Sequence, residues 1–283
     1  MNSPAAPVVQ DWDGAAGAKW VTHQARLDRM LAPLGDAAMA AACVQPGDHI
    51  LDVGCGAGAT SIALAERTGA TGRVLGLDIS PDLIAAARSN SCDLPQLNFL
   101  LGDAATAALS PAGFDLLFSR FGVMFFDEPA AAFGHMRRAM KADGRLAFVC
   151  WRSPHDNDWI RLPLRAIDGL VDLPPTDPLA PGPFAFADAA RTHDILTQAG
   201  FADISITPHD CQLTYGSGAD DAAAVDDAMS MALTIGPLAR AIALVGDDIR
   251  TQAKRRLGDI LRDRVRDGSI YFDSAAWVVT GDA

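Results

Sequence analysis

The sequence predicts an α/β fold in which a parallel sheet is covered by helices on both faces. Five short apolar segments between residues 49 and 151 alternate with helical segments, and such alternation is typical of parallel strands joined by helices. A turn with a glycine at every second position follows the first apolar segment. Ligands bind parallel α/β sheets at the carboxyl ends of the strands, near the point where the strand order reverses. We therefore expect the binding site at this turn.

The expected elements follow one another in a regular order. Strands are predicted over residues 49–53, 73–78, 97–101, 114–119 and 145–151, with helices over residues 59–68, 81–89 and 129–140. Ser80 and Pro81 supply an N-cap and a first-turn proline for the second of these helices. Before the sheet, apolar residues recur at three- or four-residue spacing from residue 12 to residue 43. That spacing predicts one helix with a buried stripe.

The pattern loosens after residue 151. Residues 173–183 contain five prolines, which predicts a surface loop. A helix is expected over residues 188–198, a strand over 202–207, mostly helical structure over 220–267 and a last strand over 276–280.

The net charge of the chain limits the class of partner that it can bind. Lysine and arginine total 23 against 35 aspartates and glutamates, a formal net charge of −12. Proteins that bind nucleic acid through its phosphates usually display a basic face, and the one short basic cluster, residues 254–256, lies in an aspartate-rich segment. We therefore expect a small-molecule partner, no nucleic acid and no membrane. A homodimer is compatible with the sequence.

Cysteine spacing and the N-terminal sequence indicate the compartment. The five cysteines are widely separated and form no C-x-x-C pair, which argues against structural zinc and against a disulfide framework. The first residues lack the basic region and apolar stretch of a signal peptide. No segment approaches the roughly 20 apolar residues that cross a bilayer. A cytoplasmic protein is expected.

The glycine turn, "ILDVGCGAGA", can be interpreted in two ways. Gly54, Gly56 and Ala59 fit the G-x-G-x-x-A pattern of dinucleotide sites. Asp52 with Gly54, Gly56 and Gly58 instead forms D-x-G-x-G-x-G, which favours an adenosyl amino acid. Glycines let a backbone approach either ligand closely, so the turn alone does not decide.

Three aspartates at successive strand ends favour the second interpretation. Asp78 ends the second strand, where a carboxylate can accept both hydroxyls of a ribose, and both candidate ligands contain a ribose. Asp52 would be desolvated at a cost unless it met a cationic amino group or a water beside the ligand. Asp103 ends the third strand, where a carboxylate can accept from the amino group of adenine.

These segments resemble the class I S-adenosylmethionine-dependent methyltransferases. "ILDVGCGAGATSIALAER", "VLGLDIS" and "LLGDAAT" are similar to the first, ribose-binding and adenine-binding motifs of that family. "FDLLFSRFGVMFFDEP" resembles the fourth-strand segment of the subgroup related to ubiquinone/menaquinone-biosynthesis methyltransferases. The resemblance implies a Rossmann-like, doubly wound, seven-stranded and mostly parallel sheet in the order 3-2-1-4-5-7-6, with strand 7 antiparallel. It also implies S-adenosylmethionine as the cofactor.

The resemblance further implies which residues surround that cofactor. On the family's pattern, the methionine part would be surrounded by Asp52, Gly54, Gly56 and Gly58. The ribose would be bound by Asp78 and Ile79, and the adenine by Asp103 and Ala104. Ser119 and Arg120 would close over the methionyl side.

Methyl transfer by in-line displacement depends mainly on positioning and on excluding water, so no catalytic side chain is obligatory. If the acceptor is a hydroxyl, a general base would help, and His155 and His23 are the candidates. The alternative is that each is a surface or packing histidine. Asp156-Asn157 resembles a metal-ligand pair of catechol-type methyltransferases, but Ser119-Arg120 stands where that family needs a carboxylate, so we expect no metal.

Apolar and aromatic residues suggest where the acceptor enters the site. Trp20, Phe121, Met124 and Trp159 are the predicted substrate-binding residues, suited to an uncharged or cationic planar molecule. Residues 1–45 would form a helical segment capping the site, residues 46–152 the cofactor-binding core, and residues 153–283 the rest of one domain.

That last segment would carry edge strands and a helical lid at about 219–268. The main hypothesis is transfer of a methyl group to oxygen, nitrogen or carbon of a small molecule. Alternatives are methylation of a protein or other macromolecule, a non-catalytic adenosyl-ligand-binding protein, and a nicotinamide-dependent dehydrogenase.

Overall fold

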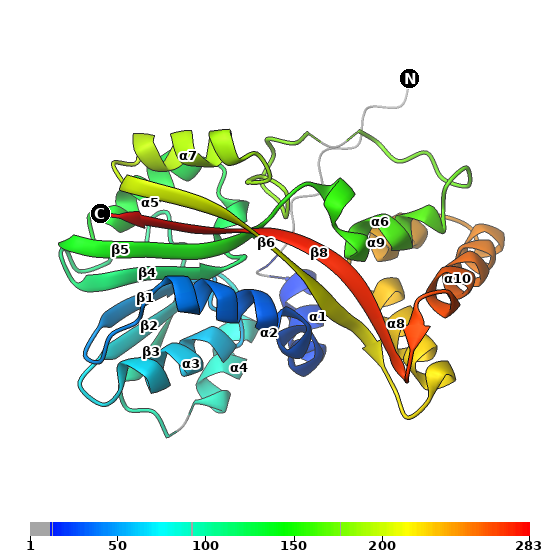
Figure 1. The fold of residues 1–283 in the computed structure, drawn as a ribbon, viewed down its shortest axis with the longest axis horizontal. Helices are drawn as coiled ribbons and strands as arrows, with labels where there is room; N and C mark the ends of the chain where they lie inside the picture. The colour runs from blue at the N-terminus through cyan, green and yellow to red at the C-terminus, as the bar shows by residue number, and fades with distance from the viewer. Residues whose placement is uncertain (1–11, 13, 92, 176) are drawn as a thin grey trace.

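A twisted sheet runs through the whole molecule and carries helices on both faces (Figure 1). The computed structural model describes residues 12, 14–91, 93–175 and 177–283. The strands are β1 His49–Val53, β2 Arg73–Asp78, β3 Leu97–Leu101, β4 Phe114–Arg120, β5 Met140–Trp151, β6 Ala202–Ser217, β7 Val265–Arg266 and β8 Ser269–Asp282. Their order is β3-β2-β1-β4-β5-β8-β6, with β7 paired to β8 alone.

This order confirms the predicted sheet. β1 to β5 are parallel, and β8 is antiparallel to both β5 and β6. The two-residue β7 forms a small hairpin with β8; without it, the sheet has the predicted order 3-2-1-4-5-7-6 with the seventh strand antiparallel.

Helices cover the core of the sheet in two layers. Those before and within the βαβ series are α1 Ala15–Thr22, α2 Gln24–Ala41, α3 Ala59–Thr68, α4 Pro81–Asn90 and α5 Pro129–Arg137. α2, α3 and α4 pack along one face, while α5 lies with α7, Ala189–Gln198, on the other (Figure 1). Phe133 of α5 packs against Phe148 of β5 and Phe186, all fully buried. Burial of such rings stabilises this layer.

The predicted N-terminal helix is wrong in one respect. The described part of this segment forms two helices, α1 and α2, because the chain breaks at His23, where φ is −109° and ψ 11°. The break lets α1 turn onto α4 while α2 crosses the sheet. Gly17 of α1 approaches Ser80 so closely that a Cβ there would lie 2.4 Å from the Ser80 hydroxyl.

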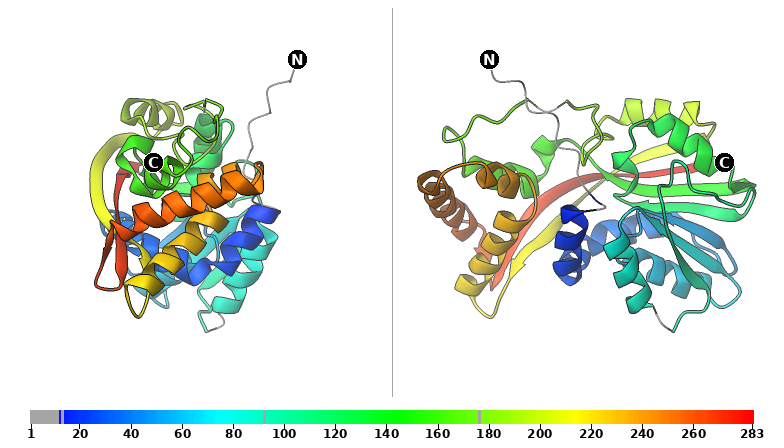
Figure 2. Two further views of the ribbon diagram at one scale, coloured as in Figure 1. Left: turned by 90° about the vertical axis from the view of Figure 1, so that its right-hand side faces the viewer. Right: turned by 180° about the vertical axis from the view of Figure 1, so that it is seen from behind.

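The last two strands are much longer than predicted. Residues 202–207 and 276–280 were expected as strands, but β6 and β8 continue past the end of β5 as a two-stranded arm. The arm carries α8 Asp221–Thr234, α9 Pro237–Ala243 and α10 Asp247–Arg262. α6, Asp158–Arg165, packs beside α9 and α10, and the right view of Figure 2 shows this group set apart from the core.

The proline-rich residues 173–183 contain no helix or strand among those the structure describes, as expected for a loop. Two short 3₁₀ turns, η1 Val123–Phe125 and η2 Pro154–Asp156, follow β4 and β5. In the described ranges of the chain, no helix combines the length and the apolar character that crossing a membrane requires.

Candidate active site

The glycine turn brings the carboxyl ends of β1 and β4 into contact. Gly54, Gly56 and Gly58 all have positive φ, at 66°, 56° and 91°, which glycine adopts without steric cost. A Cβ on Gly54 would lie 2.5 Å from the Cα of Gly122, just after β4. A Cβ on Gly56 would meet nothing within 4 Å. The turn is therefore closed on the β4 side and open at Gly56, where a ligand can approach the backbone.

Ser119 fixes the same two strand ends. Its hydroxyl donates to the main-chain oxygen of Val53 at 2.7 Å and accepts from the Gly122 N–H at 3.1 Å, and the residue is fully buried. Sequence reasoning predicted a cofactor contact for Ser119; in the structure its hydroxyl bonds to the protein backbone.

Asp52 is a fully buried carboxylate with one oxygen unpartnered. Its Oδ2 accepts from the hydroxyls of Thr60 and Ser61, at 2.7 and 2.6 Å, both near the start of α3. Its Oδ1 has no hydrogen-bond partner among the described residues. Burial raises the pKa of Asp52 to about 6. The hydrogen bonds from the two hydroxyls and the charge of Arg120 lower this pKa and so offset part of the effect of burial. Such an oxygen fits a cationic amino group or a water held beside a ligand.

Asp78, at the end of β2, shapes the turn as well as facing it. Its Oδ2 accepts from the Gly56 N–H at 2.8 Å and its Oδ1 from the Ser80 N–H at 2.9 Å. Burial raises the pKa of this carboxyl, partly offset by those bonds. A carboxylate oxygen has lone pairs for a further donor, so Asp78 can hold the turn and a ribose hydroxyl together. Ile79, beside it, is 47% exposed and offers apolar surface at the same edge.

Asp103 and Ala104 follow β3 at the same edge of the sheet. Asp103 is exposed, and its Oδ1 accepts from the Ala105 N–H at 2.8 Å, which leaves Oδ2 directed to solvent or a ligand. Ala104 is buried. The structure thus brings the three predicted aspartates, Asp52, Asp78 and Asp103, to the ends of three neighbouring strands.

Arg120 pairs with α2. Its Nη2 lies 2.6 Å from Oδ1 of Asp28 in α2, and both side chains are mostly buried. The aliphatic part of Arg120 packs so close to Gly35 that a Cβ there would lie 3.1 Å from Cδ. Its positive charge also reaches Asp52. Arg120 therefore links α2 to the methionine end of the predicted cofactor site.

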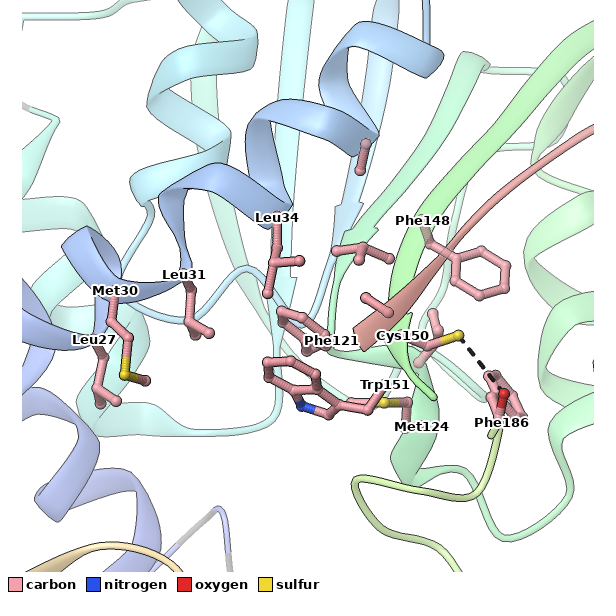
Figure 3. Packing of buried hydrophobic residues seen from close by; sticks show 14 of the residues in the cluster. Leu27, Met30, Leu31, Leu34, Phe121, Met124, Phe148, Cys150, Trp151 and Phe186 are labelled. Atoms are coloured by element: carbon pink, nitrogen blue, oxygen red, sulfur yellow. Dashed lines mark hydrogen bonds between the residues drawn. The ribbon is translucent and has the colours of Figure 1, made fainter. Parts of the chain in front are cut away.

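Phe121 and Trp151 stack at the ends of β4 and β5. Their ring centroids are 4.2 Å apart and nearly parallel, and both residues are buried. Phe121 has a φ of 63°, which is unusual for a bulky residue and often marks a functional site. Figure 3 shows this pair below Leu31 and Leu34 of α2, with Met124 on its other side.

The two other predicted substrate residues extend the aromatic surface in different directions. Trp159 packs on Trp151 and stacks on Phe184, with centroids 5.1 and 5.6 Å away. Trp20 instead packs with Trp12, whose ring also contacts Phe125. The structure thus connects Trp159 with Phe121 and Met124, while Trp20 belongs to a second cluster on α1.

Neither predicted histidine makes a side-chain hydrogen bond within the described ranges. His155 is exposed on η2, and His23 is half-buried at the break between α1 and α2. Asn157 is fully buried and its amide is used by protein: it donates to Ser153 and Ala275 and accepts from Ala275 and Trp159. Among the described residues, no group of three or more His, Cys, Asp or Glu side chains could hold a metal.

Sequence reasoning missed several residues of this region. Arg26, Asp28 and Tyr215 join α2 to β4 and to the distal arm, and Trp151 stacks on Phe121. Trp151 ends a predicted strand next to the site, so its position along the chain could have identified it. The other three carry no local signal.

Comparison with known proteins agrees with this geometry. Residues 45–158 match a family described as a methyltransferase domain. Nocamycin O-methyltransferase of Saccharothrix syringae is 28% identical over 181 residues, 60% of this chain and 64% of that protein. Demethylmenaquinone methyltransferase of Oceanobacillus iheyensis is 33% identical over 108 residues, 38% of this chain and 45% of that protein. The chain therefore spans less than two thirds of these relatives.

Solved structures share the fold. The YcgJ protein of Bacillus subtilis superposes with a TM-score of 0.57 at 16% identity, over 88% of this chain and 97% of that one. S-adenosylmethionine is the cofactor that the family and its motifs imply. The open turn at Gly56 leaves room for a ligand to approach the backbone, the unpartnered Asp52 oxygen fits a cationic amino group, and the exposed Ile79 fits an apolar part of the cofactor. Residues 45–158 of this chain thus match a methyltransferase-domain family, and the sheet around them has the strand order expected from the resemblance to the class I methyltransferases.

Proposed function

We propose that the protein transfers the methyl group of S-adenosylmethionine to a small, uncharged and planar acceptor. The observation that carries the proposal is the buried Asp52 carboxylate, whose Oδ1 has no partner in the described chain. A buried carboxylate without a partner is costly, and the amino group of the cofactor's methionine part would supply one. A dinucleotide has no ammonium group that could donate to Asp52 in this way.

In this proposal each strand end binds one part of the cofactor. Asp52 and the backbone of Gly54, Gly56 and Gly58 would face the methionine part. Asp78 and Ile79 would bind the ribose. Asp103 and Ala104 would bind the adenine at the exposed edge. Arg120 would close the methionyl side, and Ser119 would hold the β1 and β4 ends in place.

The sulfonium of the cofactor activates the methyl group, so the chain's own residues need chiefly to orient the acceptor and exclude water. Holding reactants in line can contribute roughly 7–11 kcal/mol to lowering the barrier. The predicted N-terminal segment, residues 1–45, and a lid at about 219–268 would cover the site within a single domain; residues 1–11 and 13 of that segment lie outside the described residues. A homodimer is compatible with this arrangement. His23 and His155 stay predictions for a general base; the exposure of His155 makes it dependent on movement of the loop after β5.

The aromatic surface supports the acceptor class. Phe121, Trp151, Trp159 and Phe184 form a continuous row beside the glycine turn, and Met124 packs next to it (Figure 3). Aromatic rings of this kind favour planar ligands. The names of two relatives, nocamycin O-methyltransferase and aklanonic acid methyltransferase, also indicate small-molecule acceptors.

Calorimetric titration of the whole chain with S-adenosylmethionine, S-adenosylhomocysteine, NAD and NADP tests the proposal. We expect binding of the two adenosyl ligands and no binding of the nicotinamides; the reverse result would overturn it. Transfer of a radiolabelled methyl group to a panel of hydroxylated aromatic compounds would then establish catalysis. Labelled cell proteins in place of labelled small molecules would favour a macromolecular acceptor, and cofactor binding without any transfer would favour a non-catalytic protein.

A further inference from the structure

The indole N–H of Trp12 is a buried donor that has no acceptor in the described chain. Its Nε1 is shielded from solvent and makes no hydrogen bond to any described residue. The Trp12 ring packs edge-on against Trp20 of α1 and Phe125 of η1, with ring centroids 5.4 and 5.3 Å away. Leaving a buried donor unpaired is unfavourable. A ligand that accepts from this N–H would explain its position among apolar rings.

Trp12 bridges the carboxyl ends of β2 and β4. A Cβ on Gly17 would lie 2.5 Å from the Trp12 main-chain oxygen and 2.4 Å from the Ser80 hydroxyl, so Trp12 and Ser80 flank the same point of α1. Ser80 follows β2, and its N–H donates to Asp78. The ring of Trp12 contacts Phe125, which follows β4. Because β1 lies between β2 and β4 in the sheet, Trp12 crosses the end of β1, where the glycine turn begins.

The same strand end carries an unpaired acceptor. Oδ1 of Asp52, in β1, is buried and has no partner among the described residues. The methionine part of the cofactor ends in an ammonium and a carboxylate on one carbon, so it can donate to Asp52 and accept from Trp12. Arg120, the cation whose charge reaches Asp52, is already paired with Asp28 at 2.6 Å. The carboxylate therefore needs a further donor, and the ribose and adenine carry no anion that would use one.

We propose that Trp12 selects the amino-acid end of the cofactor by donating its indole N–H to the carboxylate; this inference rests on the proposed function. The rings of Trp20 and Phe125 hold the indole in place, and the close contact at Gly17 sets its distance from the end of β2. Asp52 binds the ammonium of the same end. Trp12 is thus a binding residue for the cofactor, and ligands without the carboxylate bind more weakly.

The test compares S-adenosylhomocysteine with decarboxylated S-adenosylhomocysteine, which keeps the amino group and lacks the carboxylate. Calorimetric titration of the whole chain gives both dissociation constants. We expect the wild type to bind the first ligand at least about tenfold more tightly, the size of one hydrogen bond to a charged group. Trp12→Phe keeps a ring against Trp20 and Phe125 but removes the N–H. This preference should therefore fall about tenfold, through weaker binding of S-adenosylhomocysteine alone.

Trp277→Phe is the matched control. The Trp277 indole N–H donates to the main-chain oxygen of Ala187 at 2.9 Å, so the same substitution removes a donor that is already paired within the protein. This variant should keep the preference. Gly17→Ala tests the placement independently, because the added Cβ would push Trp12 and Ser80 apart while the indole stays in the chain. Its preference for S-adenosylhomocysteine should fall as well.

The possible results separate the inference from the proposed function. A wild type that binds both ligands equally would overturn the inference. So would a Trp12→Phe variant that keeps the preference, or one that binds both ligands more weakly by the same factor, since Trp12 would then only cover the site. Should Trp12→Phe fail to fold, a Gly17→Ala variant with the wild-type preference would overturn the inference. A wild type that binds neither ligand would instead count against the proposed function.

Discussion

The guanidinium of Arg26 in α2 donates to the main-chain oxygen of Tyr215, 189 residues further along the chain, at 2.6 Å. It also donates to the main-chain oxygen of Asp227 in α8 at 2.9 Å and pairs with its carboxylate at 3.0 Å. Burial lowers the pKa of Arg26, and the charge of Asp227 opposes that effect. Since Asp28 of the same helix pairs with Arg120, α2 connects the predicted cofactor side of the site to β6 and α8.

Arg26→Met should therefore loosen the packing of α8 and β6 against α2. Methionine keeps the apolar length of the side chain but removes the cationic partner of the Asp227 carboxylate and the side-chain donor to the Tyr215 oxygen; among the described residues, the Asp227 carboxylate then keeps only the Ser217 N–H as donor. Breaking a fully buried pair costs about 3–5 kcal/mol; because Asp227 is 36% exposed, we expect about 2 kcal/mol here. Urea titration measures the loss, and hydrogen exchange of α8 locates it. Arg29→Met, on an exposed position of the same helix, is the control and should leave both unchanged.

Two glycines of the turn should respond differently to alanine. At Gly54 the added Cβ would lie 2.5 Å from the Gly122 backbone, whereas at Gly56 it would meet nothing within 4 Å. Both have positive φ, which costs a non-glycine residue about 1–2 kcal/mol. Gly56→Ala should lose about that much stability in urea. Gly54→Ala should lose clearly more, since β1 and β4 must separate; equal losses would contradict the close approach.

Much of the sheet could be predicted because its signals are local. β1, β2 and β3 have the predicted bounds, since each is a short apolar run between turn-forming residues. The continuation of β6 through residues 208–217 could not be predicted in this way, because Pro208 and Asp210 are unfavourable in strands. Pairing with β8 stabilises them, and that pairing depends on residues more than 50 positions away.

The residues of the candidate site likewise fall into those that local sequence signals predict and those that depend on tertiary packing. Asp52, Asp78 and Asp103 could be predicted because each stands at a strand end, where parallel strands bring their carboxyl ends together. Partners such as Asp28 for Arg120, 92 residues apart, depend on how α2 crosses the sheet. No residue spacing in the sequence predicts the direction in which α2 crosses the sheet, and the break at His23 changes that direction further.

Asp78→Asn should weaken cofactor binding more than it weakens the fold. The amide can still accept one backbone N–H, so part of the turn persists, but it loses the charge that strengthens bonds to ribose hydroxyls. A hydrogen bond to a charged group contributes about 1.5–3 kcal/mol, which predicts a 10- to 100-fold rise in the dissociation constant of S-adenosylhomocysteine. Calorimetry measures this. Unchanged affinity in a folded variant would contradict the ribose assignment.

Cofactor affinity should also depend on pH through Asp52. Burial raises the pKa of this carboxyl to about 6 in the free protein, and only its ionised form attracts a cationic amino group. As the pH falls through 6, the carboxyl takes up a proton, so affinity should fall by up to about tenfold per pH unit below that value. The Asp52→Asn variant should bind the cofactor weakly at every pH, and its affinity should show no such pH dependence. The Asp103→Asn variant should also bind the cofactor more weakly, but its affinity should still fall with pH as in the wild type.

The stability of the free protein should change with pH in the opposite direction. Because the pKa of Asp52 is higher in the folded chain than the ordinary value of 3.8, protonation favours the folded state. Its contribution is full below about pH 4 and is lost as the pH rises through 6, a difference of up to about 3 kcal/mol. Comparing urea titrations of wild type and Asp52→Asn at pH 5 and pH 7.5 isolates this effect, since the variant lacks the titrating group. If the wild type gained no stability over the variant on acidification, Asp52 would not be a desolvated carboxylate, and its free oxygen would no longer support a cationic partner.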